Sequence, residues 1–63
     1  MLTLFAVRKF EGREVEVDYE NAHISDALLI SAAGGSAQSL WLQVDGEDVI
    51  LPLRGIRHLA LAH

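Results

Sequence analysis

The chain has 63 residues, and its nine acidic and five basic side chains give a formal net charge of −4. A chain of this length forms one domain, 1–63, which buries only about 60% of the surface that its unfolded form exposes. The absence of cysteine excludes disulfides and thiolate metal ligands, and the negative charge disfavours general attraction to nucleic acid or anionic lipid.

The apolar fraction of 51% is high for so small a domain. More apolar surface is encoded than one small core can hide, and small domains without disulfides or metals are often stabilised by association. We therefore expect a homo-oligomer. The chain contains no run of about 20 apolar residues that would span a membrane, and no signal peptide is evident. A cytoplasmic location is the default expectation.

The first predicted element is a strand at residues 2 to 10, with apolar side chains on both of its faces. Such a pattern predicts burial on both sides. A turn at Gly12 then leads into a second strand, so that the two strands form a hairpin. Two registers stay open, because a two-residue loop pairs Ala6 with Val17, whereas a three-residue loop pairs Val7 with Val17.

The second strand covers residues 14 to 20, where polar and apolar side chains alternate strictly. Successive side chains on a strand point to opposite faces, so Val15, Val17 and Tyr19 share one face. The opposite face carries four carboxylates, here named the acidic row: Glu14, Glu16, Asp18 and Glu20. Two interpretations stay open: the solvated face of an antiparallel strand, and a surface that docks on a basic partner.

Residues 21 to 35 allow two structures. Ser25 is a suitable N-cap for a short helix from Asp26 to Ala33. Alternatively, Ala27 to Ala33 form a short buried strand. We favour the strand, because the apolar residues 28 to 30 are contiguous instead of spaced at three and four.

The last part of the chain predicts a turn at 34–36, a hairpin over 39–53 and a short strand over 56–61. Apolar residues alternate on both arms of the hairpin, and only a loop with an even number of residues, such as Asp45-Gly46, keeps them on one face. Pro52 cannot donate a hydrogen bond to a neighbouring strand, which predicts an edge strand or a bend. The expected fold is an all-β, small antiparallel barrel of five or six strands with at most one short helical turn.

No group of side chains predicts catalysis. The acidic row is expected to be exposed and lacks the pocket that a general acid–base pair requires. The three histidines, His23, His58 and His63, are too few and too scattered to predict a metal site. We therefore expect a protein that is not an enzyme, with no catalytic residue, no metal ligand and no cofactor.

Residues 51 to 61, Leu-Pro-Leu-Arg-Gly-Ile-Arg-His-Leu-Ala-Leu, resemble the second signature of Sm-like proteins. In that family an apolar strand ends in Arg-Gly and a further short strand follows. Residues 40 to 61 also resemble the end of the Rho-binding antiterminator family. Two features of the family are missing from this sequence: its Asp-x-x-Met-Asn motif and its N-terminal helix. The resemblance implies a small β-barrel and an RNA-contacting role for Arg54-Gly55.

The function predicted from these observations is a non-catalytic interaction module, a small acidic regulator that binds another protein, with the transcription machinery as a candidate partner. The acidic row and Trp41, the single tryptophan, are the predicted partner-binding residues. One alternative is an Sm-like RNA-binding oligomer that uses the basic turn of Arg54, Gly55 and Arg57. A second alternative is a structural assembly subunit.

Overall fold

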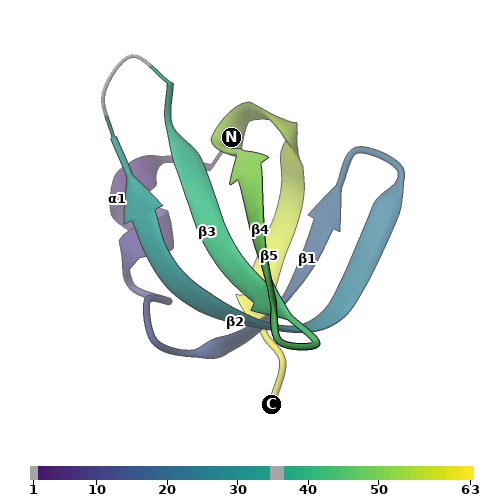
Figure 1. Cartoon of the computed structure of the whole chain (residues 1–63). Helices are drawn as coiled ribbons and strands as arrows, with labels where there is room; N and C mark the ends of the chain where they lie inside the picture. The colour runs from purple at the N-terminus through teal and green to yellow at the C-terminus, as the bar shows by residue number, and fades with distance from the viewer. Residues whose placement is uncertain (1, 35–36) are drawn as a thin grey trace.

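The computed structural model describes residues 2–34 and 37–63. The helices and strands are α1 (Leu4–Arg8), β1 (Glu14–Tyr19), β2 (Ala22–Ala33), β3 (Ser39–Val44), β4 (Glu47–Pro52), a 3-10 helix (Leu53–Gly55) and β5 (Ile56–Leu61). The strands form one antiparallel sheet in the order β4-β3-β2-β1-β5, with β4 and β5 at its edges, and the sheet is strongly curved (Figure 1). The fold is therefore mostly β, with five antiparallel strands and one short α-helix. Residues 35 and 36 of the predicted turn at 34–36 lie outside the described residues.

The strand predicted at residues 2 to 10 is wrong, because this segment contains α1. The Thr3 hydroxyl accepts a hydrogen bond from the Ala6 amide at 3.2 Å, which caps the first turn of the helix. Leu4 and Val7, three residues apart, lie on the side of α1 that packs on the core, where Val7 is fully buried. The predicted hairpin with the second strand, and both of its registers, are consequently wrong. No helix of the described residues is long and apolar enough to cross a membrane.

The connection from α1 to β1 is bonded to β2, which explains how the helix is held against the sheet. The Gly12 amide donates to the Leu29 carbonyl at 2.7 Å, and the Leu29 amide donates to the Arg13 carbonyl at 3.0 Å. One carboxylate oxygen of Glu11 accepts from the Ala32 amide at 2.8 Å. Gly12 has a φ of +81°, so the turn predicted there is present, although it follows a helix.

The preference for a strand after residue 21 is confirmed, and the alternative helix from Asp26 is wrong. The strand β2 starts at Ala22, earlier than predicted, and its pairing register shifts twice, once against β1 and once against β3. The shift against β1 lets both Ala27 and Ile24 pack on the core although they are three residues apart. Such bulges increase local twist and bending, which accounts for the curvature of β2 in Figure 1.

The hairpin of β3 and β4 confirms the prediction of an even loop. Asp45 and Gly46 both have positive φ angles, 52° and 81°, as a two-residue type I′ turn requires. Leu40 and Leu42 are fully buried. Pro52 ends β4, an edge strand, so its missing amide proton interrupts no ladder on the outer side.

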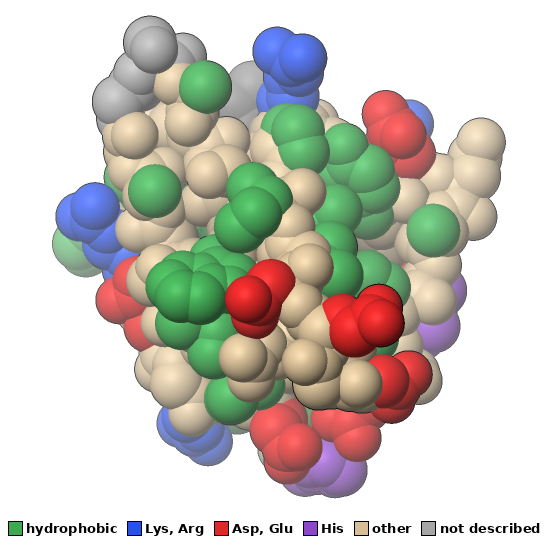
Figure 2. Space-filling view, viewed as in Figure 1, with side chains coloured by type: hydrophobic (Ala, Val, Ile, Leu, Met, Phe, Trp, Pro, Cys, Tyr) green, Lys and Arg blue, Asp and Glu red, His purple; other side chains and the backbone are tan. Residues whose placement is uncertain are grey.

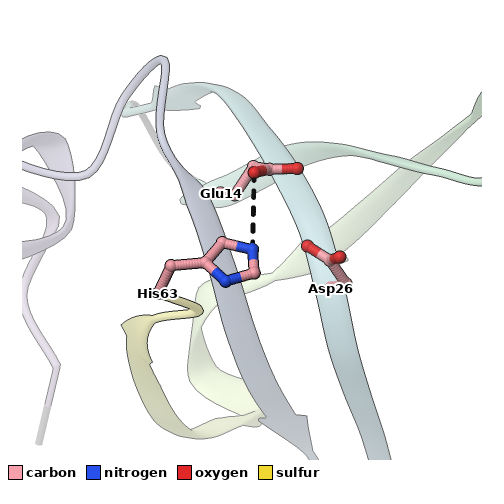
Figure 3. A group of neighbouring side chains, drawn as sticks. All are labelled: Glu14, Asp26 and His63. Atoms are coloured by element: carbon pink, nitrogen blue, oxygen red, sulfur yellow. Dashed lines mark ion pairs between the residues drawn. The ribbon is translucent and has the colours of Figure 1, made fainter.

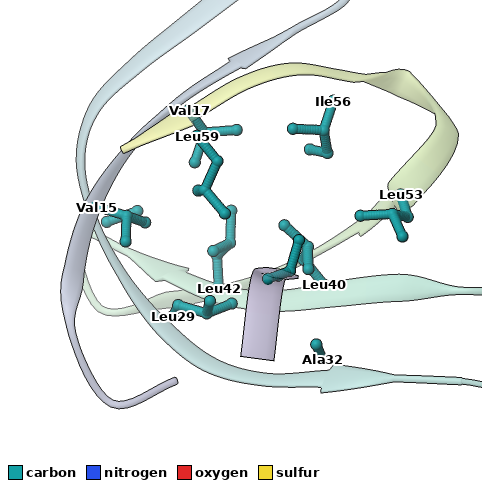
Figure 4. Close-up of a cluster of buried hydrophobic side chains, with 11 residues drawn as sticks. Val15, Val17, Leu29, Ala32, Leu40, Leu42, Leu53, Ile56 and Leu59 are labelled. Carbon is teal, nitrogen blue, oxygen red and sulfur yellow. The ribbon is translucent and has the colours of Figure 1, made fainter. Parts of the chain in front are cut away.

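A single apolar core lies on the concave face of the sheet. Its buried members are Val7, Val15, Val17, Ala27, Leu29, Ala32, Leu40, Leu42, Leu53, Ile56 and Leu59. Figure 4 shows side chains from β1, β2, β3 and β5 directed into the space that the curved strands surround. Among the described residues, no buried side chain is polar or charged. Every polar side chain of the described residues is therefore at least partly exposed, and a functional site has to be sought on the surface.

Candidate functional site: the acidic row and its histidines

Three members of the acidic row, Glu14, Glu16 and Asp18, lie on the outer face of the sheet, as the alternation in β1 predicts. Val15 and Val17 point inward and are fully buried, so the residues that alternate with them, Glu14, Glu16 and Asp18, point outward. The side chains of Glu16 and Asp18 are 40% and 41% exposed, so neighbouring groups cover more than half of each.

Each of the first three carboxylates of the acidic row has a histidine beside it. His23, on β2, contacts the Asp18 carboxylate through Nδ1. His58, on β5, places Nε2 3.9 Å from Glu16 Oε1. His63, after the end of β5, places Nε2 3.6 Å from Glu14 Oε1. We name the three carboxylates and three histidines together the histidine–carboxylate face.

Sequence reasoning missed this arrangement, because it treated the histidines as scattered surface residues. The pairing depends on register: Asp18 lies directly opposite His23 on β2 and opposite His58 on β5. Local alternation gave no signal for His58, because it shares parity with the buried Ile56 and is exposed only through the register shift between β5 and β1.

Asp18 raises the pKa of His23 above the ordinary value of 6.5. The hydrogen bond from the imidazole to the Asp18 carboxylate is the main cause; desolvation, the next effect in size, lowers the pKa, and the negative charges of Asp18 and Glu16 raise it by smaller amounts. Because the charged imidazole is favoured, the face loses part of its negative charge as the pH falls toward neutrality and below.

The predicted place of Glu20 on the strand with the other three carboxylates is wrong, because β1 ends at Tyr19 and Glu20 is a turn residue. It has a φ of +51°, a left-handed conformation that is uncommon for a residue with a side chain. Its amide donates to the Gly55 carbonyl at 3.0 Å, and its carbonyl accepts from Arg57 Nε at 3.1 Å. The β1–β2 turn is thereby tied to the start of β5.

In the turn predicted to contact RNA, Gly55 and Arg57 make contacts that stabilise the fold. A Cβ atom on Gly55 would lie only 2.8 Å from Cζ of Tyr19, so the absence of a side chain lets the aromatic ring pack on this backbone. Arg57 bonds the backbone of Glu20, while Arg54 is an exposed residue of the 3-10 helix. Two of the three predicted RNA-contacting residues therefore hold the end of β1 in place.

Trp41 lies on the outer face of β3, away from the histidine–carboxylate face. Its cross-strand partner on β4 is Ile50, and the two side chains remain 40% and 61% exposed. Figure 2 shows hydrophobic side chains gathered on this view of the molecule, with acidic side chains along the lower part of the group. Two large apolar side chains in direct register thus stand on the surface of an edge hairpin.

A shallow open hollow lies between β2 and the β3–β4 turn. Its volume is about 290 Å³, and its lining residues are His23, Ile24, Ser25, Asp26, Val44 and Asp45. Near it, Asp26 belongs to a second group with Glu14 and His63, in which one ligand atom of each residue lies within 4.8 Å of the others (Figure 3). Asp26 was not among the residues singled out from the sequence.

Comparison with known proteins identifies no relative: no family model, no curated protein and no solved structure matches the chain. The described architecture is a small antiparallel five-stranded sheet, and no family match supports membership of the Sm-like or antiterminator families.

Proposed function

We propose that this chain is a non-catalytic interaction module, a small acidic regulator that binds another protein in the cytoplasm, with the transcription machinery as a candidate partner. The exposed Trp41–Ile50 pair carries this proposal. Tryptophan is enriched among the residues that dominate protein–protein binding, and a rigid cross-strand neighbour presents it without a large entropy cost on binding.

The acidic row gives the proposed surface its charge preference. Carboxylates on the same outer face of the sheet, although away from the anchor, favour a basic partner, mainly through faster and salt-sensitive association. Because histidines already flank three of the carboxylates, repulsion within the row is partly relieved inside the chain. We therefore assign the acidic row to steering and Trp41 to anchoring.

The experiment is affinity capture from the native host, with and without nuclease, followed by titration of the purified partner. The double variant Trp41→Ser/Ile50→Thr should weaken binding at least about tenfold, as expected for a hot spot. Phe5→Ser is the matched control, because Phe5 is 79% exposed but lies on α1. Normal binding by the double variant would contradict the assignment of the anchor.

The acidic row is tested separately with Glu16→Lys/Asp18→Lys. Glu16 lies between the buried Val15 and Val17, and Asp18 follows Val17 on the same outer face, so the fold should persist, and circular dichroism checks that it does. We expect slower association and weaker salt dependence in this variant. Unchanged kinetics would mean that the acidic row is only the solvated face of β1.

The second candidate is an Sm-like RNA-binding oligomer. The helix α1 before the first strand and the Arg54-Gly55 turn before the last strand favour it, because the resemblance to Sm-like proteins implies both features. Under this proposal the curved sheet closes as a barrel, and copies associate along an edge such as β4. A structural assembly subunit is the third candidate and would bind only further copies of this chain.

Light scattering at micromolar concentration and fluorescence anisotropy with single-stranded RNA test these alternatives. Arg54→Glu is the cleaner probe of RNA contact, since Arg57 also holds the backbone of Glu20. A multimer whose RNA binding is lost in Arg54→Glu supports the RNA-binding oligomer. A multimer without RNA or protein partners supports the assembly subunit, and a stable monomer of about 7 kDa contradicts both.

A further inference from the structure

Three strands that are neighbours in the sheet bring two carboxylates and one imidazole together at one end of the acidic row. Glu14 begins β1, Asp26 lies on β2, and His63 follows β5. The three side chains place one ligand atom each within 4.8 Å of the others, and Figure 3 shows them close together. We propose that Glu14, Asp26 and His63 bind a divalent transition-metal ion of the zinc class.

The backbone fixes two of the three positions. The amide of Ala62 donates to the Glu14 carbonyl at 3.0 Å, so the segment that carries His63 is bonded to β1 immediately before that residue. His63 Nε2 already lies 3.6 Å from Glu14 Oε1. Strand pairing therefore holds the His63 imidazole beside the Glu14 carboxylate, although both side chains are exposed.

The bulge in β2 fixes the third position. Ala27 faces the core opposite Val15, which turns Asp26 outward, and the register shift then returns Ile24 to the inner side. Without the extra residue, strict alternation would turn Ile24 outward and move the residues before it to the opposite face. The bulge thus lets Asp26 face Glu14 while the core stays apolar.

The donor set and its spacing suit zinc. Zinc takes imidazole nitrogen and carboxylate oxygen at about 2.0–2.2 Å, and tetrahedral ligands at that bond length are about 3.3 Å from one another. The existing separations, at most 4.8 Å, reach this value by small side-chain rotations of exposed residues. Two carboxylates also match the charge of a divalent cation, and three protein ligands leave one tetrahedral position for water. This inference does not depend on the proposed protein partner, since the chain alone supplies the ligands.

The test is titration of the full, tag-free chain with Zn²⁺ by isothermal titration calorimetry in a non-chelating buffer. We expect saturable binding with one ion per chain. His63→Gln should lower the affinity at least about tenfold, and Glu14→Gln and Asp26→Asn should each lower it as well. Circular dichroism checks that these variants keep the fold.

The chain supplies its own matched control. His23 also sits beside a carboxylate, but it contributes to a pair instead of a group of three, so His23→Gln should leave the zinc affinity within about twofold. NMR of the imidazole groups should show the signals of His63 shifting on addition of Zn²⁺ before those of His23. No saturable binding in the wild-type chain, or an equal loss in His23→Gln and His63→Gln, would overturn the proposal.

Discussion

The inner and outer faces of the sheet differ in chemistry although they are built from the same strands. Among the described residues, the buried side chains on the inner face are all apolar, and five of them on the strands have no exposed surface: Val15, Val17, Leu29, Leu40 and Leu42. The outer face holds exposed ion pairs that water screens and that contribute little to stability, whereas truncation of a buried leucine costs about 2–5 kcal/mol. The inner face therefore provides most of the stability, and substitutions on the outer face should cost much less.

The largest expected effect comes from the core. Leu42→Ala removes a fully buried side chain and should lower the free energy of unfolding by about 2–5 kcal/mol. Gln43→Ala changes the next residue of β3 on the other face and should cost less than about 0.5 kcal/mol. Urea denaturation followed by tryptophan fluorescence measures both. Similar losses in the two variants would remove the distinction between the faces.

The next effect concerns the contact between Tyr19, at the end of β1, and Gly55, which immediately precedes the edge strand β5. Gly55→Ala would force its Cβ against the Tyr19 ring and should cost about 1–3 kcal/mol, as overpacking does. In a Tyr19→Ala background the same substitution should cost much less, because the obstructing ring is gone. Additive losses in this double-mutant cycle would show that the contact is not the cause.

A smaller effect, of opposite sign, is expected at the β1–β2 turn. Glu20 has a φ of +51°, so Glu20→Gly should relieve backbone strain and raise the free energy of unfolding by about 0.5–1 kcal/mol. Glu20→Ala removes the same charge but keeps the unfavourable conformation, so it should give no such gain. Equal stabilisation by alanine would assign the gain to charge.

The smallest effect belongs to the exposed pair of His23 and Asp18. The pKa of His23 is raised in the folded chain, so its contribution to stability is fully present below the unfolded value of 6.5 and is lost as the pH rises through the folded pKa. NMR titration should give a pKa above 6.5 that falls toward this value in Asp18→Asn. Asp48→Asn is the control. The Asp48 carboxylate accepts a hydrogen bond from Gln43 instead of a histidine, so this substitution should leave the titration of His23 unchanged.

Local sequence patterns determined much of the sheet. Strict alternation predicts β1 and its outward carboxylates, because side-chain parity in a strand needs no distant contact. The Asp45-Gly46 turn predicts its own conformation, since both residues tolerate positive φ, and it sets the register of β3 and β4. The edge position of Pro52 follows from its missing amide proton.

Only the tertiary structure decided the state of residues 2 to 10. Their apolar side chains fit either a strand or a helix, and a short segment takes the form that covers the available apolar surface. Here the helix α1 places Val7 on the core, and Glu11 then bonds the backbone of β2. Propensity within the segment contains no information about that surface.

The candidate sites also depend on the tertiary structure. The alternation in β1 placed the carboxylates outward, but the histidines join them through pairing with β2 and β5, whose registers follow from bulges that local patterns do not reveal. Glu14, Asp26 and His63 are separated by many residues in the chain and meet only because their strands are neighbours. The face to which a side chain points is set within its own strand, whereas its neighbours on adjacent strands are set by the pairing of the whole sheet.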